Sequence, residues 1–134
     1  MIIEHKLKSD LKVIPEIALS IFKKLQSLAI KEDDLFDVRL ALEEALINAA
    51  RHGNKLDKNK EIYIKVKVLP QSIELEIKDQ GNGFDYKKLP LPTDEQNLEK
   101  TSGLGVFLIK ELMDEVEFLD GGSRIKMVKF VKHE

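Results

Sequence analysis

Hydrophobic and polar residues follow two periods along this chain, one typical of strands and the other of helices. Five segments have the pattern of strands, and in most of them apolar and polar residues alternate, as in a strand with one buried face. These segments are residues 2–8, 61–68, 73–78, 116–119 and 125–131. The first is expected at a sheet edge, and the other four form two hairpins. The alternation slips at Met127 and Val128, which predicts a bulge in the last strand.

Three other segments repeat their apolar residues every three or four positions, which predicts helices. They are a helix ending near residue 28, a helix over about 33–52 and a helix over 106–113. Pro15 suits a first helical turn, so the first helix is expected to begin near it. Gly53 and the asparagine after it are a good end for the second helix.

Composition narrows the class of protein without naming a function. The 134 residues are 43% hydrophobic and 34% charged, with a net charge of -2, which suits one soluble domain over residues 1–134. The sequence has no cysteine, so thiol catalysis and a cysteine zinc site are excluded. The charge balance gives no support for nucleic-acid binding. Because no apolar run suits a signal peptide or a membrane helix, we expect a cytoplasmic protein with no membrane contact.

The second predicted helix carries a line of polar residues. Glu44, Asn48 and His52 are spaced four residues apart and therefore share a helix face, with Arg51 beside them. Glu43 lies about 100° round the helix and is expected at solvent or at an interface. Taken alone, such a line is more often a solvated face than a site.

Two glycine motifs follow at a distance. Asp79-Gln-Gly-Asn-Gly comes directly after the third strand, and Gly103-Leu-Gly105 comes directly before the third helix. Between them, about 85–102 form the longest irregular stretch, which has the length of a functional lid. Each glycine motif alone could be a simple tight loop. The order and spacing of the polar helix and both motifs are much harder to obtain by chance.

The two glycine motifs suit the two ends of a nucleotide. An ionised Asp79 accepts hydrogen bonds only, so it favours the amino group of adenine over the carbonyl oxygen of guanine. Gly81 and Gly83 let the backbone approach a flat base without a Cβ clash. Gly103 and Gly105 are expected at a helix start, where free N–H groups favour a phosphate.

The polar helix suits the reacting end of the same ligand. Asn48 offers a neutral oxygen to Mg²⁺, which prefers oxygen ligands shared with phosphates and water. Arg51, one turn further on, can reach a phosphate oxygen. Glu44 can accept a proton from a hydroxyl group or water that attacks the γ-phosphate. The motifs together predict a site for ATP and Mg²⁺.

The chain resembles the GHKL ATPase superfamily in three segments, which are similar to its N box and its two glycine boxes. These are Glu44-Ala-Leu-Ile-Asn48-Ala-Ala-Arg51-His, Asp79-Gln-Gly-Asn-Gly83-Phe and Thr101-Ser-Gly-Leu-Gly105-Val-Phe-Leu-Ile. The resemblance covers roughly residues 5–131 and is greatest to the anti-sigma factor serine/threonine protein kinases. It implies the Bergerat ATP-binding fold, an α+β two-layer sandwich with helices on one face of a mixed, mostly antiparallel sheet.

The resemblance also implies roles and partners. Glu44 would be the catalytic base, Asn48 the Mg²⁺ ligand and Asp79 the adenine contact. The other implied nucleotide contacts are Arg51, His52, Gly81, Gly83, Lys100, Thr101, Ser102, Gly103, Leu104 and Gly105. Members of this family phosphorylate a serine of an anti-anti-sigma factor, sequester a sigma factor and commonly form homodimers.

The sequence departs from the family in its lid, and alternatives stay open. The family usually carries an arginine before the second glycine box, whereas here only Lys100 could supply that charge. Lysine is a point charge without the bidentate fork of arginine. The second hypothesis is therefore an ATP-binding interaction regulator with little or no kinase activity, and a third is a plain α/β domain without nucleotide. A histidine kinase would need a preceding dimerisation helix with a phosphoacceptor histidine. It is not expected, because the only histidine in residues 1–30 is His5, in a predicted strand. His5 and His133 are both expected at the surface.

Overall fold

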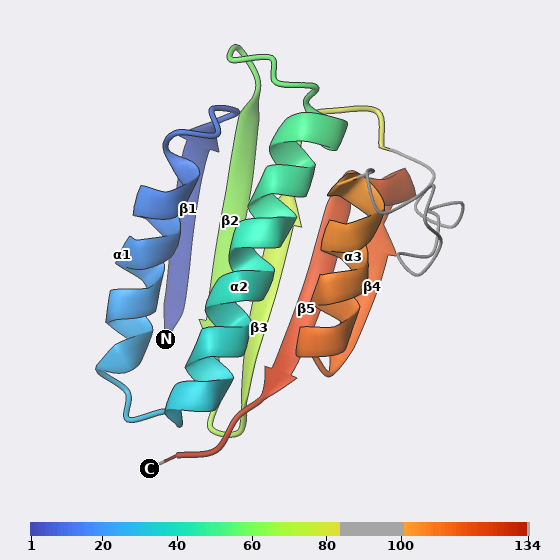
Figure 1. Ribbon diagram of the computed structural model, residues 1–134. Coiled ribbons are helices and arrows are strands. Elements are labelled where there is room, and N and C mark those ends of the chain that lie inside the picture. The colour runs from blue at the N-terminus through green and yellow to red at the C-terminus, as the bar shows by residue number, and fades with distance from the viewer. Residues whose placement is uncertain (84–100, 134) are drawn as a thin grey trace.

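The computed structural model describes residues 1–83 and 101–133, except for the side chains of residues 101–104. It contains the five strands and three helices that the hydrophobic pattern predicts (Figure 1). The helices are α1 (Ile14–Gln26), α2 (Glu32–Asn48) and α3 (Thr101–Leu112). The strands are β1 (Ile2–Lys8), β2 (Glu61–Val68), β3 (Ser72–Lys78), β4 (Glu115–Leu119) and β5 (Arg124–Phe130). None of the described helices has both the length and the apolar character needed to cross a membrane.

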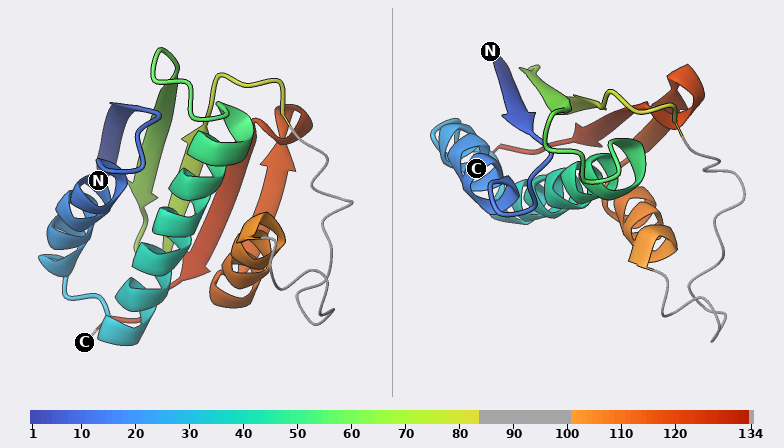
Figure 2. Two further views of the ribbon diagram at one scale, coloured as in Figure 1. Left: turned by 45° about the horizontal axis from the view of Figure 1, so that its top comes forward. Right: turned by 90° about the horizontal axis from the view of Figure 1, so that it is seen from above.

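The strands form one sheet in the order β1-β2-β3-β5-β4, so β1 lies at an edge as expected. All four pairings between these strands are antiparallel, and the sheet is therefore antiparallel rather than mixed over the described residues. The three helices cover the same face of the sheet, as the view from above shows (Figure 2). The predicted two-layer α+β sandwich is thus confirmed.

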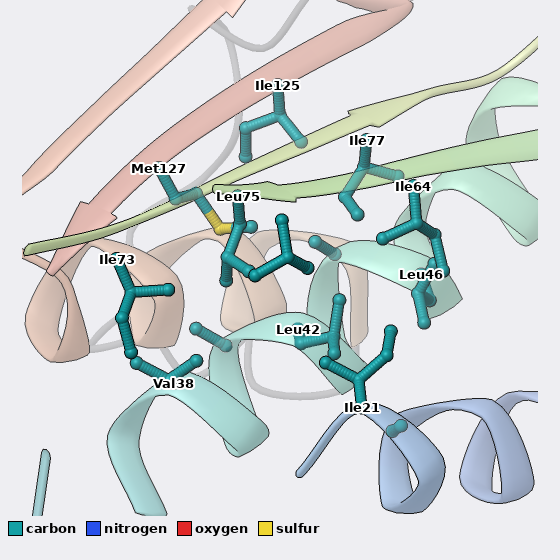
Figure 3. Close-up of a cluster of buried hydrophobic side chains, with 14 of the residues drawn as sticks. Ile21, Val38, Leu42, Leu46, Ile64, Ile73, Leu75, Ile77, Ile125 and Met127 are labelled. Carbon is teal, nitrogen blue, oxygen red and sulfur yellow. The ribbon is translucent and has the colours of Figure 1, made fainter. Parts of the chain in front are cut away.

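The core fills the space between the two layers (Figure 3). Ile21 of α1 and Leu42 and Leu46 of α2 meet Leu75 of β3 and Met127 of β5, all at most 1% exposed. Burying one such side chain contributes about 1.5–3 kcal/mol. Helix α2 lies in the middle of the helix layer, between α1 and α3, so its inner face is anchored along its whole length.

The predicted bulge in the last strand is wrong. β5 keeps an unbroken register with β3 on one side and β4 on the other. Met127 faces the helix layer, and Val128 is buried on the opposite face of the sheet, where its cross-strand partners are Glu74 and Glu115. Two apolar neighbours are therefore compatible with a regular strand that buries one residue on each face.

His5 also differs from its expected place. It lies on the inner face of β1 between the buried Ile3 and Leu7, and its Nε2 atom is buried with no hydrogen-bond partner among the described residues. Burial lowers the pKa of the His5 imidazole, and the charge of Lys24 on α1 lowers it further. His133 is exposed as expected, with Nε2 2.8 Å from the carbonyl oxygen of Pro70.

Candidate active site at the end of the central helix

Glu44 and Asn48 lie one turn apart near the C-terminal end of α2. The Oδ1 atom of Asn48 is buried and has no hydrogen-bond partner among the described residues. A buried amide oxygen without a partner costs about 1–3 kcal/mol, so it indicates a ligand that completes its bonding.

Glu44 is half-buried and lies against the neighbouring helix. A Cβ atom added to Gly105 of α3 would stand 3.0 Å from Glu44 Oε2, so the predicted base and the second glycine motif meet. Burial raises the pKa of the Glu44 carboxyl, and the negative charge of Glu43 raises it further. Arg51 lowers the same pKa, which indicates that its positive charge lies close to Glu44.

The last turn of the predicted helix is not α-helical. After Asn48 the chain forms a π-helical turn, η1 (Ala49–Gly53), and the N–H group of Asn54 donates to the carbonyl oxygen of Ala49 at 2.8 Å. This wider turn rotates His52 away from the line that an α-helix would continue from Asn48. Burial lowers the pKa of the half-buried His52, and the charge of Arg51 lowers it further. Single π turns of this kind are frequent at functional sites.

Asp79 lies directly after β3 and is only 6% exposed. Its own N–H group donates to the carbonyl oxygen of Ser123 at 2.9 Å, and its Oδ1 accepts a hydrogen bond from the Gly81 N–H group at 2.8 Å. Burial raises the pKa of the Asp79 carboxyl, whereas the Gly81 hydrogen bond and the charge of Lys60 lower it. The structure therefore holds a carboxyl group in a fixed, poorly hydrated position.

The glycines beside Asp79 are required by close contacts within the protein. A Cβ atom on Gly53 would overlap the Asp79 carboxylate, and one on Gly81 would overlap the carbonyl oxygen of Gly53. Gly83 has a positive φ of 82° and packs against the carbonyl oxygen of Gly121. The first glycine motif is thus packed onto η1 and onto the turn between β4 and β5.

The second glycine motif lies within α3 and not before it. The predicted helix start at residue 106 is wrong by five residues, because α3 begins at Thr101. Gly103 and Gly105 therefore belong to its first turns, and the first four N–H groups of a helix have no partner within it. Lys100 and most of the predicted lid at 85–102 lie outside the described residues, as do the side chains of Thr101, Ser102 and Leu104.

One residue of the site was given only a minor role by the sequence, as the end of the second helix. Asn54 is fully buried and its Oδ1 accepts a hydrogen bond from the Gln80 N–H group at 2.7 Å. Its Nδ2 donates to Ser9 and to the backbone of Glu61. The available sequence signal was a polar residue directly after a helix-ending glycine.

A separate hollow of about 460 Å³ lies on the uncovered face of the sheet, remote from Glu44 and Asn48. Three of its charged residues have partners: Arg124 contacts Glu76 at 2.8 Å, and Lys6 lies 5.8 Å from the ring centre of Tyr63. We therefore place the candidate site between the helices and the Asp79 loop.

Comparison with known proteins identifies the family of this chain. Residues 7–129 match the model of the histidine kinase-like ATPase domain family. The serine-protein kinase RsbW of Bacillus licheniformis is 32% identical over 139 residues, covering 98% of this chain and 87% of that protein. The serine-protein kinase RsbW of Staphylococcus epidermidis is 33% identical over 142 residues, covering 98% and 88% respectively.

Similarity to a solved structure supports the fold and nothing further. The crystal structure of the RsbU and RsbW domains of Rv1364c from Mycobacterium tuberculosis superimposes with a TM-score of 0.69 at 13% identity. The match covers 99% of this chain but only 33% of that longer chain. From the family match and the two RsbW relatives, the chain belongs to the histidine kinase-like ATPase domain family and, within it, to the serine-protein kinases of the RsbW type.

Proposed function

We propose that this protein is an anti-sigma factor with ATP-dependent serine/threonine kinase activity toward an anti-anti-sigma factor. The names of its relatives support the kinase activity. In partner switching, the protein would bind either the sigma factor or its antagonist. Phosphorylating the antagonist would weaken that complex and leave the kinase free to bind the sigma factor. We also propose that it acts in the cytoplasm as a homodimer.

The observation that carries the proposal is the unpartnered Oδ1 of Asn48, one helical turn from Glu44. An amide oxygen suits Mg²⁺, which accepts a single protein ligand when phosphates and water supply the rest. The described residues contain no group of three His, Cys, Asp or Glu side chains that could hold a metal on its own. The donor set therefore fits a metal that is held jointly with a nucleotide, and Asn48 would be its protein ligand. Bound MgATP would supply the transferable phosphoryl group and neutralise its charge.

Glu44 suits the role of a catalytic base. Its carboxyl is held against Gly105, and burial raises its pKa toward the range where a base works best near neutral pH. It would accept the proton of the attacking serine hydroxyl. Arg51, whose charge acts on Glu44, would contact the phosphates, and His52 lies in the same turn.

The nucleotide's other end would meet Asp79 and its loop. A buried carboxylate that accepts a hydrogen bond from the amino group of adenine discriminates against guanine, which has an acceptor at that position. Gly81 and Gly83 shape the loop, and the free N–H groups at the start of α3 would face phosphate oxygens. The implied contacts of Lys100 through Leu104 belong to this proposal as well.

Labelled ATP tests the proposed activity directly. Glu44→Gln and Glu43→Gln would each be incubated with γ-labelled ATP and a candidate anti-anti-sigma factor from the same organism. We expect Glu44→Gln to lose roughly a hundredfold or more in phosphate transfer while it keeps ATP binding. The adjacent Glu43 is the matched control: it pairs with Arg39 at 3.2 Å, and its loss costs at most about 1 kcal/mol. Equal transfer by Glu44→Gln and the native protein would remove Glu44 from its assigned role.

A second function is favoured by one feature of the sequence. No arginine occurs in residues 85–102, and a bidentate phosphate contact from that segment is therefore missing. The chain would then be an ATP-binding interaction regulator with little kinase activity. ATP-dependent binding of the sigma factor without any transfer to the antagonist would favour this second function over the first.

A further inference from the structure

Three polar side chains are buried in the described part of the chain, namely Ser9, Asn54 and Asp79. Asn54, which is 0% exposed, connects the other two. Its Nδ2 donates to Ser9 Oγ at 2.6 Å, and its Oδ1 accepts from the N–H group of Gln80, the residue after Asp79, at 2.7 Å. The side chain thus links the end of β1 to the loop that carries Asp79.

Asn54 and Gln80 also form a closed ring of hydrogen bonds with the first residue of β2. Asn54 Nδ2 donates to the carbonyl oxygen of Glu61 at 3.0 Å, and the Glu61 N–H group donates to Gln80 Oε1 at 2.7 Å. The ring joins the residue after η1, the start of β2 and the second residue after β3. Both amide hydrogens and the amide oxygen of Asn54 are used, so only a neutral amide satisfies all three contacts.

The position of Asp79 depends on this ring. The Asp79 carboxylate lies on the Cα atom of Gly53, the residue before Asn54, and Gly81 lies on the carbonyl oxygen of Gly53. Three consecutive N–H groups of this loop are bonded. That of Asp79 donates to the carbonyl oxygen of Ser123, and that of Gln80 donates to Asn54. The Gly81 N–H group donates to the Asp79 side chain. Gly53 and Asn54 therefore contact all three residues of the Asp79 loop, 79–81.

We propose that Asn54 is a positioning residue that fixes the Asp79 carboxyl in the orientation that selects adenine over guanine. This inference rests on the proposed ATP site. Asn54 acts through Gln80 and makes no contact with the nucleotide. Loss of the Asn54 side chain would let the loop shift, although the Asp79 carboxyl group itself would still be present. The affinity for ATP and the selectivity for adenine would therefore fall together.

Asn54→Ala and Ser9→Ala separate positioning from stability. Both variants remove a hydrogen bond of the same buried group, but the side chain of Ser9 bonds to Lys60 and Asn54 and, among the described residues, to none of residues 79–81. Both variants would be measured under conditions in which they are folded. We expect Asn54→Ala to raise the Kd for ATP about tenfold and to reduce the preference for ATP over GTP by about tenfold. Ser9→Ala should change both by less than about twofold.

A second measurement needs no nucleotide. The Gln80 amide is protected by Asn54 Oδ1, so its hydrogen exchange should be about tenfold faster or more in Asn54→Ala and unchanged in Ser9→Ala. If Asn54→Ala does not fold, Asn54→Leu fills a similar volume, offers the Gln80 N–H group no acceptor and adds no charge near Asp79. That variant should show the same loss of ATP affinity and selectivity.

The outcomes distinguish this inference from the proposed function. If the native protein does not bind ATP, the proposed function fails. If the native protein binds ATP and Asp79→Asn removes the binding, but every folded Asn54 variant keeps full affinity and selectivity, only the positioning role fails. Losses of ATP affinity that follow the lost stability equally in the Asn54 and Ser9 variants would also overturn it.

Discussion

The Glu44 carboxylate lies directly against the backbone of Gly105, with only 3.0 Å between Glu44 Oε2 and the position that a Cβ atom on Gly105 would take. The two residues are far apart in sequence and come from α2 and α3. Because Gly105 has no side chain, the carboxylate of the proposed base can lie close to the backbone of α3.

Gly105→Ala should reduce phosphate transfer more than it reduces ATP affinity. The added methyl group would push the flexible Glu44 side chain by a few tenths of an ångström, and misplacement of a reacting group can cost up to a hundredfold. Alanine is favoured over glycine in a helix by about 0.8–1.0 kcal/mol, so stability should not fall. Single-turnover transfer, ATP titration and thermal unfolding would measure the three effects. Equal transfer rates in variant and native protein would contradict the predicted crowding.

Asn48→Leu should stabilise the free protein and abolish the effect of Mg²⁺. Replacing a buried oxygen without a partner by an apolar group of similar size removes its desolvation cost, which is about 1–3 kcal/mol. The same change removes the proposed metal ligand. We expect ATP binding to become independent of Mg²⁺ while the midpoint of urea unfolding rises. A variant that is less stable than the native protein and still responds to Mg²⁺ would contradict both expectations.

The sequence predicted the fold well because its elements depend on local periods. The strands of 2–8 and 61–68 were found at the observed boundaries, and the order of elements was right. The start of α3 was missed because Gly103 and Gly105 disfavour a helix locally. Their place in α3 depends on its contact with α2, which no local pattern reports.

The errors at the site have the same origin. His5 is an exception, because it was expected at the surface as a polar residue although alternation places it on the same face as Ile3 and Leu7. Asn54 was interpreted only as a helix end, since its partners Ser9 and Gln80 are 45 and 26 residues away in sequence. The π turn at 49–53 likewise ends at Gly53, which packs against Asp79 from beyond β3. Motifs thus indicated the residue types, and long-range contacts decided their positions.

Gly53→Ala should impair both stability and ATP binding. A Cβ atom there would overlap the Asp79 carboxylate, so the Asp79 loop must move, and overpacking of this kind costs about 1–3 kcal/mol. Gly121→Ala is the matched control: its φ of 71° strains alanine, but the new methyl group would meet open space. We expect the control to lose stability and keep ATP affinity, as judged by urea unfolding and ATP titration. Equal loss of affinity in both variants would count against the predicted contact.

Asp79 should make the free protein less stable as the pH rises. In the unfolded chain its carboxyl ionises at its ordinary pKa of 3.8, whereas burial raises the pKa in the folded protein. Between those two pKa values the folded state binds more protons than the unfolded state, so the free energy of unfolding falls with rising pH. Above the folded pKa this loss is complete and constant.

Asp79→Asn removes that ionisation and keeps an oxygen that can accept the Gly81 hydrogen bond. We therefore expect the stability of the variant relative to the native protein to increase as the pH is raised from about 4 to 7, which urea unfolding at each pH would measure. The difference between the two proteins isolates Asp79 from Glu44, whose pKa is also raised by burial. The same variant should bind ATP roughly ten- to a hundredfold more weakly, because a charge-assisted hydrogen bond is lost. A stability difference that does not change with pH would mean that Asp79 ionises equally well in the folded and unfolded chain. Gain of stability together with loss of ATP affinity is the result expected of a residue kept for binding and not for folding.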